Sequence, residues 1–471
     1  MSPSRLAYRA LTLLACALPS VASAAEIDGA ALGAVWGIPF AGILLSIALA
    51  PLLAPHFWHH HYGKVALAWA AAFMLPFAVL YGPALAGAAF VHAALAEYIP
   101  FIILLTALFT VAGGIHIRGN FHGSPGFNCG LMALGAGLAS FMGTTGASML
   151  LIRPLIRAND NRKHVAHVIV FFIFIVSNIG GSLTPLGDPP LFLGFLKGVD
   201  FFWTAQHIIP ETLFLVVVLL GLFYAIDSHY YRKEGVLRQD PTPDTPTFAI
   251  EGKVNLVLLG VIVALVLMSG TWKPGVEFSV FGTPVGLPQL VRDGLLIAVA
   301  VLSWFVTPKG VHERNQFDWE PMREVGKLFA GIFLTIAPVL AMLKAGSDGA
   351  FAPVVGLVTG ADGQPIPAMY FWATGILSSF LDNAPTYLVF FNLAGGDPQV
   401  LMNALAPVLV AISAGSVFMG ANSYIGNAPN LMVKAIAENR GIRMPSFFGY
   451  MAWSGAILIP LFVAMTFLFL G

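Results

Sequence analysis

The stretch SNIGGSLTPLGDPPLFL, residues 177–193, decides the fold of this chain. It follows the apolar run Val165–Val176, and the chain becomes apolar again after it. Glycine or proline at six of its positions prevents a continuous helix, and Asn178 and Asp188 add polar groups. Non-helical backbone at bilayer depth survives only where protein or a water-filled cavity shields it. The stretch therefore predicts a membrane helix that is interrupted at its centre.

A comparable stretch, SVFMGANSYIGNAPNLM at residues 416–432, interrupts another apolar segment far downstream. Two interrupted apolar segments in corresponding places point to the binding site of a membrane transporter. We call the two segments, predicted over residues 165–196 and 400–438, the opened helices.

The composition is that of a protein with many membrane spans. Hydrophobic residues make up 58% of the 471 residues and charged residues only 10%, whereas soluble domains carry about 25% charged residues. Apolar runs long enough to cross a bilayer recur along the chain. The formal net charge of zero excludes a basic surface for nucleic acid. The two cysteines, Cys16 and Cys129, fit neither a disulfide framework nor a metal motif. We therefore expect an all-α polytopic membrane protein without a cofactor.

The first 24 residues have the pattern of a signal peptide. Arg5 and Arg9 precede the short apolar run Ala10–Leu18, and Ala22-Ser23-Ala24 forms a small-residue cleavage site. An uncleaved first helix is the alternative. Cleavage would leave the mature N-terminus outside and indicates a multi-pass protein of the bacterial inner (cytoplasmic) membrane.

Two further apolar segments break in the middle, which predicts re-entrant hairpins that enter and leave the membrane on one side. The first hairpin, residues 127–158, breaks at Gly143-Thr144-Thr145-Gly146. The second, residues 368–394, breaks at Asp382-Asn383-Ala384-Pro385-Thr386. Both breaks place polar side chains where the chain is otherwise apolar.

The polar segment 232–253 predicts a cytoplasmic linker because three prolines stand among its charges. It separates an N-terminal half, residues 25–231, from a C-terminal half, residues 254–471. If both hairpins are re-entrant, most Lys and Arg residues fall on the inner side, as the positive-inside rule requires. Apart from the signal peptide, the outer side keeps only Lys197, Lys273, Arg292 and Lys344 of the 23 basic residues.

The two halves share residues at a fixed offset of 239 positions, and the matches fall on the breaks. The matching pairs are Ser140 and Ser379, Ser177 and Ser416, Gly181 and Gly420, Gly187 and Gly426, and Pro190 and Pro429, while Asp188 falls opposite Asn427 and Thr144 opposite Asn383. By the charge distribution the first hairpin opens inward and the second outward. The chain is therefore expected to contain two inverted repeats, each with a re-entrant hairpin and an opened helix, and a site near mid-membrane.

We expect each hairpin tip to meet the opened helix of its own half. The candidate ion- or substrate-binding residues carry hydroxyl, amide or carboxylate groups: Thr144, Thr145, Ser177, Asn178, Thr184, Asp188, Asp382, Asn383, Thr386, Asn422, Ser423 and Asn427. Their oxygen atoms suit a small hard cation, whereas the N-termini of half-helices favour an anion.

Asp188 and Asp382 favour the cation and are the candidate ligands of Na⁺. A charge inside a break is costly at bilayer depth and indicates function, and a carboxylate there can hold either a proton or a cation. The structural alternative is that each aspartate only caps the helix that follows. No Lys or Arg lies in the breaks to balance a tricarboxylate unless sodium ions accompany it. Without an HExxH or GxSxG motif, an intramembrane enzyme is not expected.

At these residues the chain resembles the ion transporter superfamily, most closely the bacterial sodium/proton antiporters and the citrate-transporter-like proteins grouped with them. The motifs that carry the resemblance are SFLDNAPT at 379–386, SNIGGSLTPLGDPP at 177–190 and GANSYIGNAPN at 420–430. The resemblance implies a homodimer with a scaffold domain and a transport domain that moves like an elevator. The dicarboxylate branch has Ser-Asn-Thr in both opened helices, but Ile179 follows Ser177-Asn178 here, which argues against a dicarboxylate.

The sequence thus predicts a secondary transporter that exchanges Na⁺ for H⁺ through its intramembrane aspartates. The alternative is a sodium- or proton-coupled transporter of citrate or another carboxylate anion. In both cases the bilayer is the surrounding medium, and nucleic acid is not a partner.

Overall fold

The computed structural model describes residues 27–119, 121–237, 249–361 and 363–471. The predicted signal peptide and the centre of the predicted linker, residues 238–248, lie outside the described residues. The described chain is mostly helical, with two short two-stranded sheets. The fold is therefore that of a polytopic helical membrane protein.

In the described part of the chain, eight helical segments are long and apolar enough to cross a membrane. Most of them bury less than a third of their apolar window, because their outer faces are available to lipid. Their elements are α2 (Ile38–Leu53), α3 (Pro55–Tyr81), α4 (Pro83–His92) continuing through the π-helical η3 (Ala93–Tyr98) into α5 (Ile99–Gly113), α10 (Trp203–Glu234), α11 (Val254–Thr271), α12 (Leu287–Val306), α14 (Glu320–Lys344) and α21 (Phe447–Phe469).

Ten further helical pieces form the segments that are predicted to be broken. In the N-terminal half these are α6 (Pro125–Met142), α7 (Thr144–Ala158), α8 (Ala166–Ile175), η4 (Ile179–Gly181) and α9 (Pro189–Leu196). In the C-terminal half they are α16 (Pro367–Phe380), α17 (Asn383–Leu393), α19 (Ala406–Phe418), η6 (Met419–Asn422) and α20 (Ala428–Asn439).

The second opened helix begins later than residue 400, where it was expected. Pro398–Met402 forms a separate short helix, α18, and α19 starts only at Ala406. Pro407 is the second residue of α19, in the first turn, where helices accept proline.

The remaining elements are short and lie at the ends of the bundle or beside it. The helices are η1 (Gly29–Ala31), η2 (Ala34–Gly37), α13 (Lys309–Arg314), η5 (Gly346–Asp348) and α15 (Ala352–Leu357). The strands are β1 (His116–Arg118), which pairs antiparallel with β2 (Ala249–Glu251), and β3 (Glu277–Val280), which pairs antiparallel with β4 (Thr283–Gly286).

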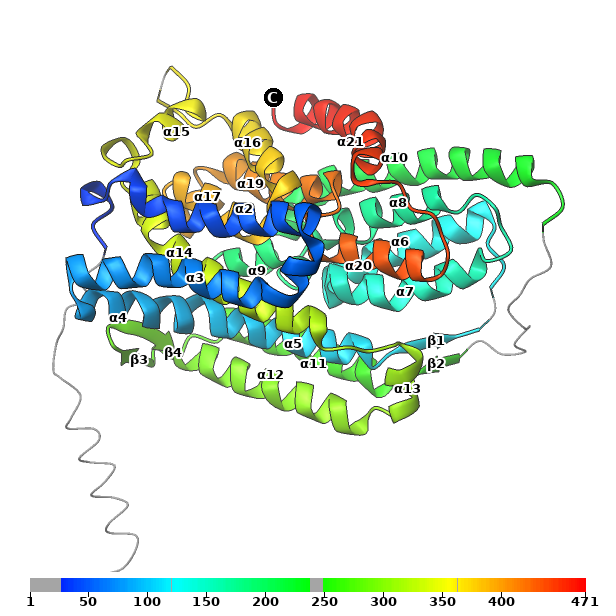
Figure 1. Cartoon of the computed structure of the whole chain (residues 1–471), viewed down its shortest axis with the longest axis horizontal. Helices are drawn as coiled ribbons and strands as arrows, with labels where there is room; N and C mark the ends of the chain where they lie inside the picture. Colours follow the sequence, from blue (N-terminus) through cyan, green and yellow to red (C-terminus); the bar gives the residue numbers. More distant parts are fainter. Residues whose placement is uncertain (1–26, 120, 238–248, 362) are drawn as a thin grey trace, which may run out of the picture.

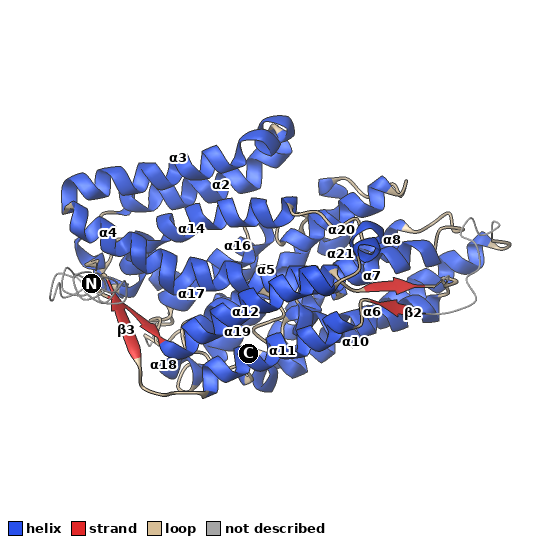
Figure 2. Cartoon of the chain, turned by 90° about the horizontal axis from the view of Figure 1, so that it is seen from below, coloured by secondary structure: helices blue, strands red, loops and turns tan. Residues whose placement is uncertain are grey.

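Most long helices run along the long axis of the molecule (Figure 1). The β1–β2 sheet lies at one end of this axis and the β3–β4 hairpin at the other. Helices α6 and α7 occupy the half of the molecule near β1 and β2, whereas α16 and α17 occupy the opposite half. Figure 2 shows α2 and α3 side by side along one edge, next to α14.

The first parts of the two opened helices form the centre of the molecule. All residues of α8 from His167 to Ile175 are buried, and so are those of α19 from Val408 to Phe418. Helix α8 packs against α6, α10 and α20, and α19 packs against α16, α17 and α10. A helix that is apolar all round belongs in such a fully enclosed position. The interruptions at the ends of α8 and α19 therefore lie deep inside the protein.

Candidate functional site

The carboxylate of Asp188 lies at the centre of a buried polar cluster. Only 1% of Asp188 is exposed. The hydroxyl Oγ1 of Thr144 donates to Oδ1 over 2.9 Å, and Nδ2 of Asn427 donates to the same oxygen over 3.2 Å. The amide Nδ2 of Asn383 donates to the other oxygen, Oδ2. Asp188 occupies the N-cap position of α9, but its side chain makes no capping hydrogen bond there. Its carboxylate is used for the cluster instead.

Each of the three donors stands at the start of a helix. Gly143, with φ +81°, allows the sharp turn between α6 and α7 that brings Thr144 to the site, and the backbone N–H of Thr144 donates to the carbonyl of Gly187 over 2.8 Å. Asn383 is the first residue of α17. Asn427 is the N-cap residue of α20. Together with α9, four helix N-termini therefore converge on Asp188.

This arrangement differs from the pairing expected within each half. Thr144 does meet Asp188 of its own half. Asn383, however, contacts Asp188 of the other half rather than the second opened helix. Asn427 also crosses to the first half, where its Nδ2 lies 3.2 Å from the carbonyl of Ser177 and 3.3 Å from Oδ1 of Asn178. The site is thus formed by residues from both halves of the chain.

Two buried asparagines fasten the two opened helices to each other. Asn178 donates from Nδ2 to Oδ1 of Asn430 over 2.8 Å and to the carbonyl of Ile173 over 2.9 Å. Asn430 in turn donates to the carbonyls of Gly420 and Ser423, each over 2.9 Å. These side chains satisfy carbonyls that the interrupted helices leave free. They also hold Asn427 beside Asp188.

The two halves make the same hydrogen bonds at positions 239 residues apart. Ser140 donates to the carbonyl of Gly180 over 2.6 Å, and Ser379 donates to that of Met419 over 3.1 Å. Further equivalent bonds run from Thr184 to the carbonyl of Ser140 and from Ser423 to the carbonyl of Ser379. Thr184 and Ser423, both candidate residues, therefore anchor the opened helices to α6 and α16 and do not contact Asp188.

The glycines of the two breaks permit equally close backbone contacts. A Cβ atom on Gly187 would overlap the carbonyl of Gly181, and a Cβ atom on Gly426 would lie 2.5 Å from the carbonyl oxygen of Gly420. The offset between these contacts is again 239 residues. Glycine is required at both places because any side chain would push apart the two backbone segments that meet within the break.

Asp382 caps the helix that follows it. Its Oδ1 accepts a hydrogen bond of 3.1 Å from the backbone N–H of Ala384, which is the capping geometry that the structural alternative describes. Thr386 donates to the backbone carbonyl of Asp382 over 2.9 Å. Asp382 is only partly buried and also lines the cavity beside Asp188. The cap and a role in the cavity are compatible.

Of the other candidate residues, one lines the cavity and two support the breaks. Thr145 lines the same cavity as Asp188. Ser177 shares a hydrogen bond of 2.8 Å with Ser148 of α7. Asn422 donates to Oγ of Ser379 over 2.9 Å, while its Oδ1 is buried without a hydrogen bond among the described residues. Ser177 and Asn422 therefore support the breaks rather than line the cavity.

A cavity of about 110 Å³ adjoins the carboxylates of Asp188 and Asp382. The first residues of α7, α9, α17 and α20 form its polar wall. Its apolar wall comes from α5 and α14, with Phe101, Leu104 and Phe329 among its residues. No Lys, Arg or His side chain is among the described lining residues. The cavity is thus small, acidic on one side and apolar on the other.

The apolar wall had no signal in the sequence, because α5 and α14 read as ordinary spans. In the sequence Ser140 and Ser379 stand out only as matching positions, whereas in the structure their hydroxyls and carbonyls anchor both opened helices. The 239-residue offset was the signal that could have assigned them this role.

Among the described residues, there is no group of three or more His, Cys, Asp or Glu side chains that could hold a metal ion. The oxygens near the cavity belong to carboxylates, a hydroxyl, side-chain amides and backbone carbonyls. Such oxygens are ligands for hard cations, as they are for Ca²⁺ and Mg²⁺. The arrangement therefore places oxygen ligands for a cation and an ionisable carboxyl group at one cavity.

The comparisons with known proteins agree with a membrane transporter. A family model described as "Putative citrate transport" matches residues 29–470. An uncharacterized transporter of Mycobacterium tuberculosis is 26% identical over 404 residues, which cover 78% of this chain and 85% of that protein. A 46 kDa membrane protein of Mycobacterium leprae is 24% identical, covering 68% of this chain and 71% of its own length. An uncharacterized transporter of Synechocystis is 23% identical, covering 68% and 72%.

Proposed function

This chain belongs to the family described as "Putative citrate transport", and we propose that it is a secondary transporter that exchanges sodium ions for protons across the bacterial inner membrane. Sodium and a proton compete for Asp188, with Asp382 as the neighbouring acid. At the outer face a proton displaces sodium from the carboxylate, and that sodium leaves to the outside. At the inner face the proton is released and sodium from the cytoplasm takes its place.

The observation that carries this proposal is the charge of the cavity. Two carboxylates, Asp188 and Asp382, face it, and no basic side chain is among its described lining residues. An anion would therefore meet two acids without a compensating cation, whereas a sodium ion would neutralise one of them. Its volume of about 110 Å³ also lies below the roughly 300–1,000 Å³ of typical small-molecule pockets. An ion with a few water molecules fits this space.

The polar cluster can interact with Asp188 in two ways, one for the empty carboxylate and one for the carboxylate with sodium bound. When the carboxylate is charged and empty, Thr144, Asn383 and Asn427 donate hydrogen bonds to it. A side-chain amide carries an acceptor oxygen opposite its donor nitrogen. Rotation of either amide replaces the donor by an oxygen ligand when sodium binds. The same side chains thus stabilise the empty site and contribute to ion binding.

The proposed architecture follows from the breaks and their equivalent hydrogen bonds. Helices α6–α7 and α16–α17 form re-entrant hairpins, and the two halves are inverted repeats that meet at Asp188. The apolar wall of α5 and α14 belongs to the scaffold domain, against which the hairpins and opened helices move together. The transporter is a homodimer through its scaffold domains.

The decisive experiment compares ions in proteoliposomes that contain the full chain and a pH-sensitive dye. After a pH jump, Na⁺, Li⁺, K⁺ and citrate are added side by side. Proton flux that depends on Na⁺ without citrate supports the exchange. Flux that requires citrate, or uptake of radiolabelled citrate, contradicts it.

The second candidate is a sodium- or proton-coupled transporter of citrate or another carboxylate. The observation in its favour is the convergence of four helix N-termini, those of α7, α9, α17 and α20, on one cavity. Helix N-termini attract anions because their free N–H groups and dipoles point at the ligand. Here the same N-termini already face Asp188, so a bound carboxylate would need sodium ions between the two acids and itself.

A further inference from the structure

Another cavity, of about 700 Å³, lies between the loop that joins α7 to α8 and the loop that joins α20 to α21. Its wall also includes the end of α10 and the first turns of α8 and α21. The charged residues that line it are Asp160, Arg162, Lys163, Arg440 and Arg443. We call it the basic cavity, because four of its five charged lining residues are basic.

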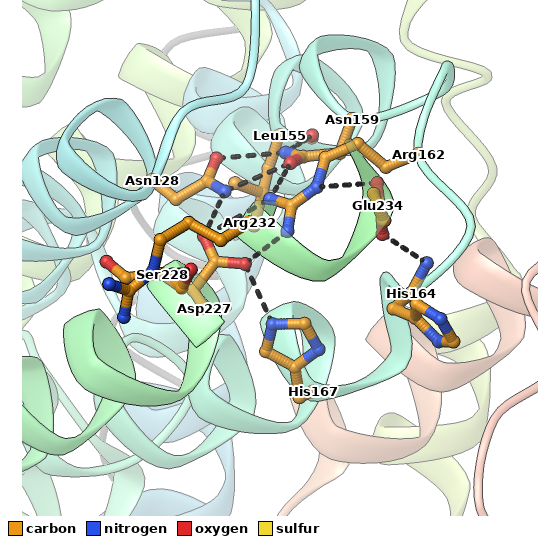
Figure 3. Close-up of polar contacts among 10 residues, drawn as sticks. All are labelled: Asn128, Leu155, Asn159, Arg162, His164, His167, Asp227, Ser228, Arg232 and Glu234. Atoms are coloured by element: carbon orange, nitrogen blue, oxygen red, sulfur yellow. Dashed lines mark hydrogen bonds and ion pairs between the residues drawn. The ribbon is translucent and has the colours of Figure 1, made fainter. Parts of the chain in front are cut away.

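One of these basic residues is already neutralised inside the protein, as Figure 3 shows. Arg162 donates from Nη2 to Oδ1 of Asp227 over 2.6 Å, and its Nε lies 3.7 Å from Oε2 of Glu234. His167 contacts the same Asp227 oxygen over 2.8 Å, and Asn128 contacts the other over 3.1 Å. This buried network fixes the back wall of the cavity and holds the α7–α8 loop against α10.

The other basic residues have no such compensation. Lys163, Arg440 and Arg443 are exposed and form no ion pair with any residue that the structure describes. Asp160, the acid in the wall, already interacts with other groups. Three cations of like charge therefore face one water-accessible space, and an anion in it would relieve their mutual repulsion.

Two more arginines on α7, Arg153 and Arg157, lie near Arg440 but outside the wall of the cavity. Nε and Nη1 of Arg153 are buried without a hydrogen bond to any described residue, and so is Nε of Arg157. The guanidinium of Arg440 is close enough to repel both electrostatically. Helices α7 and α20 pack against each other, so this repulsion acts directly across their contact.

The rim of the basic cavity has the side chains of a membrane interface. Tyr230 of α10 and Trp453 of α21 line it and are only partly buried. Tyrosine and tryptophan concentrate at the level of the lipid headgroups. Basic pockets between membrane helices bind the phosphates of lipid headgroups.

We propose that the basic cavity is a binding site for a phosphate group, held by Lys163, Arg440 and Arg443 between the two loops. The phosphate is that of an anionic phospholipid headgroup or a free phosphate ion. The site is separate from Asp188 and does not depend on which ion the protein transports.

An anion bound in the basic cavity would link α7 and α20, the two helices that each begin at or beside a hydrogen-bond donor to Asp188. Helix α7 begins at Thr144 and ends beside the cavity, and α20 begins after Asn427 and ends at Asn439, with Arg440 as its C-cap residue. A phosphate that bridges the two loops neutralises the charges that push α7 and α20 apart. The bound anion therefore stabilises the packing of α7 on α20.

The test measures binding to the full chain, purified and freed of lipid in a zwitterionic detergent. Native mass spectrometry follows retention of phosphatidylglycerol, with phosphatidylcholine as the neutral lipid. Thermal unfolding is measured in parallel with inorganic phosphate against chloride at equal ionic strength. The Arg440→Gln/Arg443→Gln variant removes two charges from the cavity, and the matched control Lys253→Gln/Lys309→Gln removes two exposed charges outside its wall.

We expect phosphatidylglycerol to bind the unmodified chain better than phosphatidylcholine does, and Arg440→Gln/Arg443→Gln to weaken this binding about thirtyfold. The control variant and the charge-keeping variant Arg440→Lys/Arg443→Lys should stay within a few-fold of the unmodified chain. Stabilisation by inorganic phosphate as well identifies a site open to the free ion, and its absence identifies the lipid headgroup. If neither probe binds, or if both glutamine variants lose binding equally, the proposal is wrong.

Discussion

Asn427 donates a hydrogen bond of 3.2 Å to Asp188, although the two residues occupy the same place in two segments 239 positions apart. Thr144 and Asn383 have the same relationship, and both donate to Asp188 as well. Two pairs of matching positions thus meet at one carboxylate. Because one member of the central pair is an acid and the other an amide, one carboxylate stands at the centre of the site.

Replacing the central acid should stop exchange. Asp188→Asn keeps an acceptor oxygen for Thr144 but removes the group that holds sodium or a proton. We expect Na⁺-dependent proton flux in proteoliposomes to fall to the level of empty vesicles. The exposed carboxylate of Asp348 supplies the control Asp348→Asn, which should transport normally. Full activity of a folded Asp188→Asn protein would refute the proposed role.

Asp382 can be tested separately as a charge and as a helix cap. Asn caps helices about as well as Asp, whereas Ala costs about 1 kcal/mol at this position. Asp382→Asn should therefore fold normally but lose exchange in inverted vesicles, and Asp382→Ala should in addition unfold at a lower temperature. Unchanged sodium-dependent proton flux in Asp382→Asn would leave capping as the only function of this residue.

Removing the amide of Asn427 should weaken ion binding more than folding. Its Nδ2 contacts Asp188, the carbonyl of Ser177 and Oδ1 of Asn178. In the proposed bound state the amide rotates and its oxygen ligates Na⁺, and a polar contact with a charged group contributes about 1.5–3 kcal/mol. Asn427→Ala removes this ligand and should raise the Na⁺ concentration for half-maximal flux at least tenfold. The matched control is Asn403→Ala, an exposed asparagine on the α18–α19 connection. An equal shift in both variants would contradict the assignment.

The glycine contacts in the breaks should be intolerant of a methyl group. Gly426→Ala brings Cβ to 2.5 Å from the carbonyl oxygen of Gly420 and 2.8 Å from that of Ser378, so we expect a loss of about 1–3 kcal/mol. Gly187→Ala should behave alike. Gly130 on α6 has no neighbour within 4 Å of the place that a Cβ atom would occupy, so Gly130→Ala should be neutral or slightly stabilising. Thermal unfolding in detergent distinguishes these outcomes.

Replacing only one partner of the buried ion pair between Arg162 and Asp227 should strongly destabilise the fold. Both side chains are completely buried, and removing one partner of such a pair costs about 3–5 kcal/mol because the other charge stays unpaired. Arg162→Met should therefore lower the unfolding temperature strongly, and Arg162→Met/Asp227→Leu should recover part of the loss. The exposed pair of Lys434 and Glu438 is the control, and Lys434→Met should change stability by under about 1 kcal/mol.

Local features of the structure could be inferred from the sequence because they depend on neighbouring residues. Glycine and proline act on the backbone where they stand, and they interrupt α8–α9 and α19–α20 within the stretches that the sequence singled out. In the stretch predicted as the second opened helix, residues 400–438, α19 begins at Ala406, with Pro407 in its first turn. The capping alternative for Asp382 likewise rests on its position before α17.

The contacts that make the site were decided by the tertiary structure. Asn383 reaches Asp188 across 195 positions and Asn178 reaches Asn430 across 252, and neither pair follows from the order of the chain. The apolar wall formed by α5 and α14 also depends on how rigid helices pack, and so does the buried ion pair of Arg162 and Asp227. The sequence determines where each helix must break, because backbone conformation is local. Which breaks face each other is decided only when the helices bury their surfaces together.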